Sequence, residues 1–350
     1  MRTHILRSSA AVTAAAALAL AGCGGDGDAG PTGSTNPDSD AGSLVVYSGR
    51  GEELVQPVIN EFQEATGIDV SVRYGDTAQL AAQLLEEGDR TQADVYFAQD
   101  GGALGALTKA GMLAELPDEL LEIVDPRFRA ADGSWVGTSG RARVIVYDAD
   151  KLDESDVPDS VSELTDPEWN GRVGIAPGNA SFEAFVTAIR VLHGDDAAQD
   201  WLEGMAANNV ERFDNNRLIL AAVNDGVIEL GLINHYYWFE QVADHGPDAV
   251  PSRLKFLPGG DAGALVNVAG VGILDSTEEH AAAERFVEYL LGEQAQTYFA
   301  EETKEYPLLD GVPTADDLPP LETLDAPAID LSDLDSLEET LRMIEEAGLT

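Results

Sequence analysis

The adjacent phenols of Tyr236 and Tyr237 have the most distinctive chemistry in this sequence. They follow Asn234 and His235, at the end of the apolar run 227–233, which is typical of a buried strand. A phenol donates a hydrogen bond and, once it loses its proton at a pKa of about 10, offers an anionic oxygen. Neighbouring side chains of a regular strand point to opposite faces, so both phenols can serve one site only if the backbone turns there.

Histidine and cysteine form no catalytic pattern. The five histidines, at positions 4, 193, 235, 245 and 280, are scattered, and only His235 lies in a suggestive place. The sequence contains no P-loop, HExxH, GxSxG or CxxC motif, and its single cysteine excludes intrachain disulfides and thiolate metal sites. We therefore expect a binding protein and not an enzyme. A metal-dependent enzyme that uses His235 is the remote alternative.

The first residues have the features of a targeting signal. Arg2 and Arg7 precede an Ala-rich apolar run, 10–21, which ends in the small residues of Leu-Ala-Gly-Cys at Cys23. This order is typical of a signal peptide, and the run is shorter than the roughly 20 residues of a membrane-spanning helix. Leu-Ala-Gly-Cys also resembles the bacterial lipobox, whose cysteine is lipidated. We expect a signal peptide over 1–22, a lipidated Cys23, and a flexible polar tether that ends at residue 42.

The composition is that of a globular protein with a strongly acidic surface. Of the 350 residues, 44% are hydrophobic, and the formal net charge is -44, with four lysines among the 20 basic residues. Nucleic acids bind to basic patches, so this charge argues against a nucleic-acid partner. Acidic charge attracts cations nonspecifically and does not by itself indicate a metal site. The roughly 300 residues after the tether suggest two lobes.

Strand patterns and helix patterns alternate along the rest of the chain. Apolar runs such as 43–49 and 93–99 alternate with amphipathic segments such as 52–67 and 77–88, and the second half repeats this order. The alternation predicts an α/β protein with mainly parallel sheets and with ligands at the carboxyl ends of the strands. The apolar segment 264–274 predicts a long strand that returns to the first lobe. Residues 333–347 predict a final helix.

Several segments closely resemble the periplasmic ferric-iron-binding proteins of bacterial ABC importers. They include VVYSGRGEELVQPVINEFQEATGIDV, SGRARVIVYDADKL, GLINHYYW and PGGDAGALVNVAG, and they extend in order from Leu44 into the C-terminal helices. The resemblance implies the type II periplasmic-binding-protein fold, in which two hinge-linked lobes close over a ligand. The expected boundaries are 44–140 plus 263–300 for lobe 1, 141–262 for lobe 2 and 301–350 for loops and a helix packed on the lobes, with hinges near Val136–Ser139 and Pro258–Ala264.

The resemblance also implies that Tyr236 and Tyr237 bind Fe³⁺ as phenolates. Ferric iron is a hard cation that favours anionic oxygen, and the metal must displace the phenol protons. A synergistic anion, carbonate or phosphate, is expected beside the iron, because PGNASFE resembles the anion-binding turn of the family and leads into a helix. The residues expected to hold the anion are Asn179, Ala180, Ser181, Asn216, Asn234 and Arg50.

Three positions depart from the ligand sets of the family. Gly51 stands where some members have a histidine ligand, and Gln99 stands where they have a carboxylate. Asn179 lies near the place of a further tyrosine ligand in other members. We therefore expect the anion and water to complete the coordination of the iron. Gln99, Asp100 or Glu52 are the expected contacts from the first lobe.

The main alternative is the same fold carrying an organic anion, a phosphonate or a polyamine. A polyamine site would use converging carboxylates and aromatics, of which the tyrosines and Trp238 supply a part. An anion site would use Arg50 and the turn at Asn179 and leave the tyrosines as hydrogen-bond donors. The resemblance further implies a monomer that delivers its cargo to a membrane permease and its ATPase, held at the outer face of the cytoplasmic membrane only by its lipid anchor.

Overall fold

The computed structural model describes residues 42–350. The predicted signal peptide, Cys23 and the predicted tether up to residue 41 lie outside the described residues. Across residues 42–350, no helix combines the length and the apolar character that crossing a membrane requires.

The strands join into one hydrogen-bonded system in which two parallel groups flank an antiparallel centre. Their bounds are β1 (Ser43–Ser48), β2 (Asp69–Tyr74), β3 (Val95–Ala98), β4 (Val136–Asp148), β5 (Val173–Ile175), β6 (Glu211–Arg212), β7 (Leu230–Asn234), β8 (Ser252–Lys255), β9 (Val266–Ile273) and β10 (Tyr306–Pro307). The order is β2-β1-β3-β9-β4-β7-β5-β6, and β8 and β10 pair with β4. β1 is parallel to β2 and β3, and β5 is parallel to β6 and β7. β4 and β9 run antiparallel between these groups.

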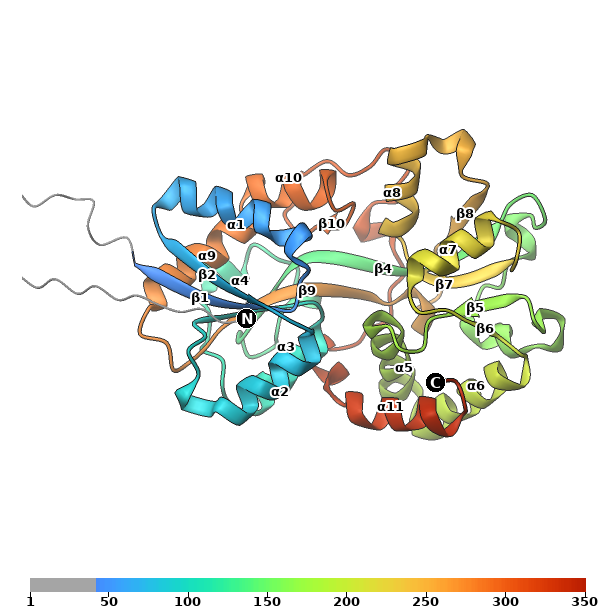
Figure 1. Cartoon of the computed structure of the whole chain (residues 1–350), viewed down its shortest axis with the longest axis horizontal. Coiled ribbons are helices and arrows are strands. Elements are labelled where there is room, and N and C mark those ends of the chain that lie inside the picture. Colours follow the sequence, from blue (N-terminus) through green and yellow to red (C-terminus); the bar gives the residue numbers. More distant parts are fainter. Residues whose placement is uncertain (1–41) are drawn as a thin grey trace, which may run out of the picture. The chain divides into compact units, whose positions relative to one another are not determined.

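Helices cover both faces of each parallel group. Their bounds are α1 (Glu52–Thr66), α2 (Thr77–Glu87), α3 (Gly101–Lys109), α4 (Asp118–Leu121), α5 (Ala180–His193), α6 (Asp195–Ala207), α7 (Asn216–Asn224), α8 (Tyr236–His245), α9 (His280–Leu291), α10 (Glu293–Glu301) and α11 (Leu337–Glu346). In Figure 1, α1, α9 and α10 lie on one side of β1–β3, and α2 and α3 lie on the other. Around β5–β7, α7 and α8 lie on one side and α5, α6 and α11 on the other.

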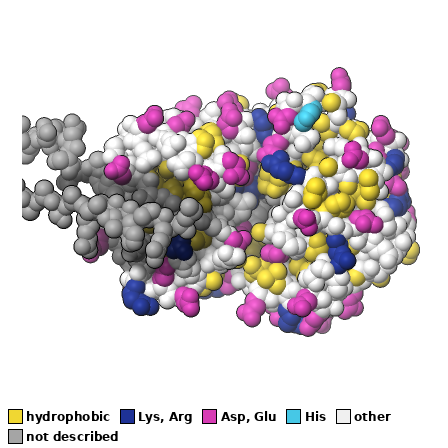
Figure 2. All heavy atoms as spheres, in the orientation of Figure 1, with side chains coloured by type: hydrophobic (Ala, Val, Ile, Leu, Met, Phe, Trp, Pro, Cys, Tyr) yellow, Lys and Arg dark blue, Asp and Glu magenta, His cyan; other side chains and the backbone are white. Residues whose placement is uncertain are grey.

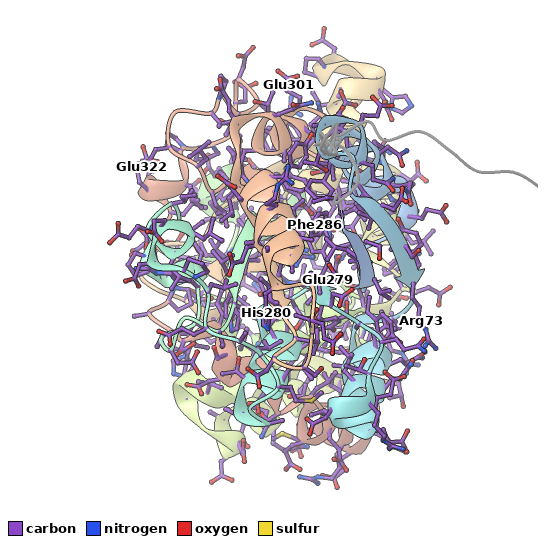
Figure 3. The ribbon with its side chains drawn as sticks, turned by 90° about the vertical axis from the view of Figure 1, so that its left-hand side faces the viewer. Arg73, Glu279, His280, Phe286, Glu301 and Glu322 are labelled. Atoms are coloured by element: carbon purple, nitrogen blue, oxygen red, sulfur yellow. The ribbon has the colours of Figure 1, made fainter. Side chains whose placement is uncertain are left out.

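Amphipathic spacing explains why these helices form and pack. α1 buries Val55, Val58, Ile59 and Phe62, which recur at helical spacing, and Gly67 ends the helix at a φ of 73°. Phe62 meets Phe286 of α9 edge to face, with ring centroids 5.1 Å apart. Figure 3 shows Phe286 at the centre of this end of the protein. A second apolar core lies around β5, α5 and α6.

β4 passes from one parallel group to the other. Its residues 136–142 pair with β9, whereas residues 143–147 pair with β7 and residues 145–148 pair with β8. The predicted hinge at 136–139 therefore lies within β4, before its pairing partner changes. The other predicted hinge, 258–264, leads through a short 3-10 helix, Ala262–Ala264, into β9. The predicted lobe boundaries and the hinge motion stay predictions.

Two details differ from the sequence predictions, and one is confirmed. The predicted helix 333–347 is divided into a 3-10 helix, η9 (Leu331–Asp335), and α11. Ser336 breaks the helix with φ -83° and ψ 49°, and its carbonyl and hydroxyl both accept hydrogen bonds from Arg190. β4 begins at Val136, earlier than the predicted strand at 141. The predicted return of 264–274 to the first group of strands is confirmed, because β9 pairs with β3.

Candidate functional site

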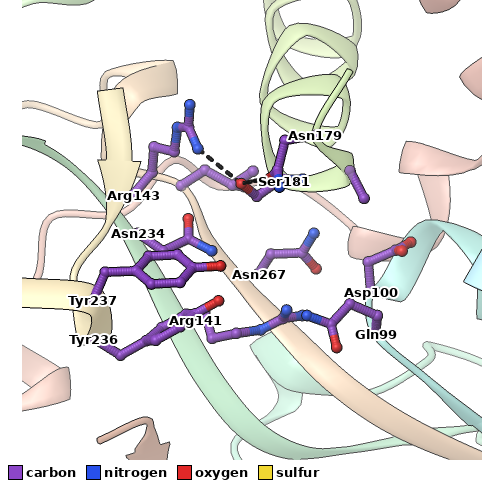
Figure 4. Close-up of a pocket in the computed structure, with 12 residues that line it drawn as sticks. Gln99, Asp100, Arg141, Arg143, Asn179, Ser181, Asn234, Tyr236, Tyr237 and Asn267 are labelled. Atoms are coloured by element: carbon purple, nitrogen blue, oxygen red, sulfur yellow. Dashed lines mark hydrogen bonds between the residues drawn. The ribbon is translucent and has the colours of Figure 1, made fainter. Parts of the chain in front are cut away.

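A small cavity lies where β4, β7 and β9 meet the first turns of α3, α5 and α8. It encloses about 80 Å³. Figure 4 shows its lining, which contains phenol, amide, carboxyl and guanidinium groups. The lining residues are Gln99, Asp100, Arg141, Arg143, Asn179, Ala180, Ser181, Asn234, Tyr236, Tyr237, Leu265 and Asn267.

The two tyrosines reach this cavity together because the chain turns from a strand into a helix. β7 ends at Asn234, His235 already has helical dihedral angles, and α8 begins at Tyr236. The rings of Tyr236 and Tyr237 consequently lie side by side, with centroids 4.2 Å apart and planes inclined by 36° (Figure 4). The expectation that the backbone must turn at this point is confirmed.

Burial makes the phenol of Tyr236 hard to deprotonate. Burial raises the pKa of Tyr236 well above its usual value, and the neighbouring Tyr237 raises it further, while Arg141 partly opposes both effects. A phenolate therefore forms here only when a strong cation displaces the proton.

His235 supports the turn and is not available as a ligand or a base. Its Nδ1 accepts a hydrogen bond from the Ala142 backbone N–H (3.2 Å), and its Nε2 lies 3.0 Å from the Lys304 carbonyl oxygen, to which it donates. Burial lowers the pKa of His235 to about 4, so the ring is neutral. Because both nitrogens are engaged with the backbone, the remote hypothesis of an enzyme that uses His235 loses its candidate base.

The first turn of α5 forms a polar wall of the cavity. Asn179 caps the helix, and its Oδ1 accepts hydrogen bonds from the Ser181 backbone N–H (3.1 Å) and from Ser181 Oγ (2.6 Å). From α7, the Asn216 amide donates to Asn179 Oδ1 (3.2 Å) and to Ser181 Oγ (3.1 Å). Asn216 therefore holds the turn without lining the cavity. A helix N-terminus of this kind suits an anion.

Two arginines of β4 were missed as candidate site residues. Arg141 and Arg143 are two residues apart on one strand, so their side chains share a face. Both are nearly fully buried. The Arg143 guanidinium donates to Ser181 Oγ (3.0 Å) and to the Leu232 carbonyl (3.1 Å). Burial lowers the pKa of Arg143 to about 9, so it is still a cation at neutral pH. The signal was present in the sequence, since two arginines interrupt an otherwise apolar strand pattern.

The side of the cavity near α3 is less charged than the side near β4. Asp100 caps α3 by accepting a hydrogen bond from the Ala103 N–H (2.9 Å), and burial raises its pKa despite that bond and the nearby Arg141. Asn267 of β9 accepts a hydrogen bond from the Gly101 N–H (3.2 Å) and was also missed. The predicted contacts Gln99 and Asp100 both line the cavity.

Besides Asn216, two further predicted residues do not line the cavity. Arg50 is buried, and its guanidinium is bound to both carboxylate oxygens of Glu305 (2.9 Å each) and to Gln99 Oε1 (3.1 Å). Its expected contact with the anion is therefore replaced by an internal ion pair. Glu52 is exposed at the start of α1 and does not line the cavity.

The donor set suits a hard cation accompanied by an anion. Among residues 42–350, no three His, Cys, Asp or Glu side chains are arranged to hold a metal ion. The oxygen atoms that the cavity offers a cation come from the two phenols, the Asp100 carboxyl group and several amide side chains. Two buried guanidinium groups and a helix N-terminus favour an anion beside it. The same arginines disfavour a polyamine, whose ammonium groups they would repel.

The chain is similar to known iron-binding proteins. Residues 91–332 match the model of the bacterial extracellular solute-binding protein family. The major ferric iron-binding protein of Neisseria meningitidis serogroup B is 36% identical over 310 residues, which cover 87% of this chain and 93% of that protein. The Fe(3+)-binding periplasmic protein of Serratia marcescens is 33% identical over 307 residues, which cover 87% of this chain and 90% of that protein.

A solved structure is similar over nearly the whole described chain. The crystal structure of iron-bound HitA from Pseudomonas aeruginosa has a TM-score of 0.81 at 36% identity, covering 88% of this chain and 99% of that one. This likeness confirms the predicted two-lobed α/β fold of type II. The names of these three proteins describe iron binding and no enzymatic activity, in agreement with the expectation of a binding protein.

Proposed function

The chain belongs to the bacterial extracellular solute-binding protein family, and on this premise we propose that it captures ferric iron for import. One observation carries the proposal. Two adjacent phenols converge on a small cavity that also contains two buried arginines and the first turn of α5. The similarity to proteins named for binding ferric iron supports the choice of cargo.

In this proposal, Tyr236 and Tyr237 bind the iron as phenolates. The Fe³⁺ ion displaces the phenol protons, so binding releases protons and weakens as the pH falls. Two phenolates leave one positive charge on the ion. A carbonate or phosphate anion at the first turn of α5, held by Arg141 and Arg143, offsets that charge and occupies further coordination positions. Water and the side chains of Gln99 or Asp100 complete the shell.

The proposed cellular role is delivery of iron to a permease and its ATPase at the outer face of the cytoplasmic membrane. Lipidation of Cys23 would anchor the protein, and the polar segment up to residue 42 would let the folded part reach its partner. Changing Cys23→Ala is expected to move the protein from the membrane fraction to the soluble fraction of a cell extract. Retention of the variant in the membrane fraction would contradict the lipid anchor.

A second candidate function is the binding of an organic anion, such as a phosphonate, without iron. It is favoured by Arg141 and Arg143, which can hold an anion in the absence of a metal. The phenols would then act as hydrogen-bond donors. The cavity of about 80 Å³ favours a small anion.

Equilibrium dialysis separates the two functions. The soluble chain from Gly42, stripped with chelator, is dialysed against ferric citrate with phosphate or carbonate, and iron is counted by elemental analysis. Parallel arms contain phosphate alone, methylphosphonate alone and spermidine alone, with thermal shift as the readout. We expect one iron per chain in the arms that contain phosphate or carbonate. Stabilisation by methylphosphonate or spermidine in a folded protein that retains no iron would contradict the proposal.

A further inference from the structure

Arg217 contacts the ring of Tyr237 from outside the cavity. It lies in the first turn of α7, and its guanidinium carbon is 5.0 Å from the centroid of the Tyr237 ring. Its Nη1 also pairs with Glu240 Oε2 at 2.5 Å. Because Glu240 lies on α8 three residues after Tyr237, the ion pair fastens α7 to the helix that begins with the tyrosine pair.

We propose that Arg217 is a positioning residue for Tyr237, which holds the ring in place and stabilises its phenolate when the metal is bound. The proposal rests on the proposed iron site. Arg217 does not line the cavity, so it acts on the cargo only through the tyrosine.

The physical basis is the charge of the guanidinium over an aromatic face. A cation is attracted to the negative face of a neutral phenol ring, and the attraction grows when the ring carries the charge of a phenolate. Arginine stays protonated at physiological pH, so this charge is always present. The side chain of Arg217 is 58% exposed, whereas that of Glu240 is 18% exposed. Added salt therefore screens the contribution of Arg217.

Asn216, which precedes Arg217 on α7, contacts the part of the site that is proposed to bind the anion. Asn216 donates to Asn179 and Ser181 in the turn proposed for the anion, while Arg217 contacts the proposed metal ligand Tyr237. Two consecutive residues of one helix thus support both groups of proposed ligands. Through these two residues, α7 can hold the proposed metal ligand and the proposed anion-binding turn at a fixed position relative to each other.

The test compares Arg217→Gln and Arg217→Lys with a matched control, Arg73→Gln. Arg73 lies 5.1 Å from the ring centroid of Tyr47, and its Nη1 donates to that phenol oxygen at 3.3 Å, but neither residue lines the cavity. Figure 3 labels Arg73, which lies on β2. Each variant is titrated with ferric iron and phosphate while the visible phenolate-to-iron absorption band is recorded, with citrate as competitor.

Removal of the cation raises the energy of the phenolate electrons, so the band of Arg217→Gln is expected at longer wavelength. We expect its iron dissociation constant to rise about twofold to fivefold at low salt, as for a cation–π contact at an exposed site. The difference should shrink at about 1 M salt, where the Debye length is about 3 Å. Arg217→Lys should lie between Arg217→Gln and the wild type, and Arg73→Gln should match the wild type.

A wild-type band that is unchanged in Arg217→Gln, with the same iron affinity, would overturn the role of Arg217 alone. A weaker affinity without a band shift, not restored by lysine, would also overturn it, because the residue would then be merely structural. Absence of any band in the folded wild-type protein would overturn the tyrosinate iron site itself, together with this inference.

Discussion

At the scale of residues, His235 and Tyr236 are neighbours with contrasting roles. Both ring nitrogens of His235 form hydrogen bonds with backbone groups, one in β4 and one in the segment before β10, and the side chain is fully buried. Tyr236 directs its ring into the cavity instead (Figure 4). The histidine thereby ties the tyrosine turn to two other segments of the chain.

The buried His235 is expected to make stability depend on pH. Its pKa of about 4 in the folded protein lies below the value of about 6.5 in the unfolded chain, so the unfolded state binds the proton first. The stability contribution is full above about pH 6.5 and is lost as the pH falls to about 4, a loss of about 3 kcal/mol in the free energy of unfolding. Denaturant unfolding of the iron-free wild type and of iron-free His235→Asn at several pH values measures this loss in the free energy of unfolding.

The control is His280→Asn, at the exposed start of α9. We expect the stability difference between the wild type and His235→Asn to decrease between pH 6.5 and pH 4, while the His280→Asn difference stays flat. Parallel stability curves for the wild type and His235→Asn would contradict the neutral, buried histidine.

At the scale of elements, close packing ties η9 to α3. A Cβ atom added at Gly102 would lie 2.4 Å from the Leu334 carbonyl oxygen, and one at Gly105 would lie 2.1 Å from the Ser332 carbonyl oxygen. Leu331 and Leu334 are buried in the same core as the strands β1 and β3. Residues near the C-terminus therefore stabilise the part of the protein that is formed mainly by the start of the chain.

Replacement of Gly105 by alanine is expected to destabilise the protein. In an exposed helix this change would stabilise by about 1 kcal/mol, because alanine has the higher helix propensity. Here the methyl group would collide with the backbone of η9, and overpacking of this kind costs about 1–3 kcal/mol. The free energy of unfolding of Gly105→Ala, from a denaturant titration, shows whether the overpacking outweighs the gain in helix propensity. An increase in stability would show that η9 does not pack on α3 as described.

The predictable elements were those with a strong local pattern. Helices such as α1 and α2 and strands such as β1 and β9 could be predicted from apolar spacing. The residues that they bury lie close together in the sequence and repeat with the period of the helix or strand. The break at Ser336 was not predictable, because it depends on hydrogen bonds from Arg190, which is distant in sequence.

The same distinction applies to the cavity. The resemblance pointed to the tyrosines, the turn at Asn179 and the segment at Gln99, all of which line it. Arg141 interrupts the apolar pattern of its strand and could have been noticed, but its place in the cavity depends on the pairing of β4 with β9, where it lies opposite Asn267. Arg50 was expected at the anion, but it pairs with Glu305, 255 residues away in the sequence. Such long-range partners leave no local pattern.

At the scale of the whole molecule, the surface is acidic and the cavity contains positive groups. Figure 2 shows Asp and Glu side chains spread over the visible face with few Lys or Arg between them, in line with the net charge of -44. The two arginines of the cavity are buried beneath this surface. The protein thus places a site for an anion inside a molecule whose exterior repels anions over long range.

Closure of the lobes is expected when iron binds. β4 and β9 run side by side between the two parallel groups of strands (Figure 1), so bending of these two strands would bring the groups together. We expect small-angle X-ray scattering to give a smaller radius of gyration with ferric iron and phosphate than without them. The Tyr236→Phe, Tyr237→Phe double variant should show no change. An equal radius for the iron-free and iron-bound wild type would contradict the closure.

The most direct test of the tyrosinate iron site is a visible absorption titration of the chelator-stripped chain with ferric iron and an anion. The account predicts a phenolate-to-iron charge-transfer band that saturates at one iron per chain and is lost in the Tyr236→Phe, Tyr237→Phe double variant. The control is Tyr298→Phe, which should keep the band. The hydroxyl of Tyr298 donates to the Leu54 carbonyl, away from the cavity. No band in the folded wild type, or a band that survives in the double variant, would contradict the account.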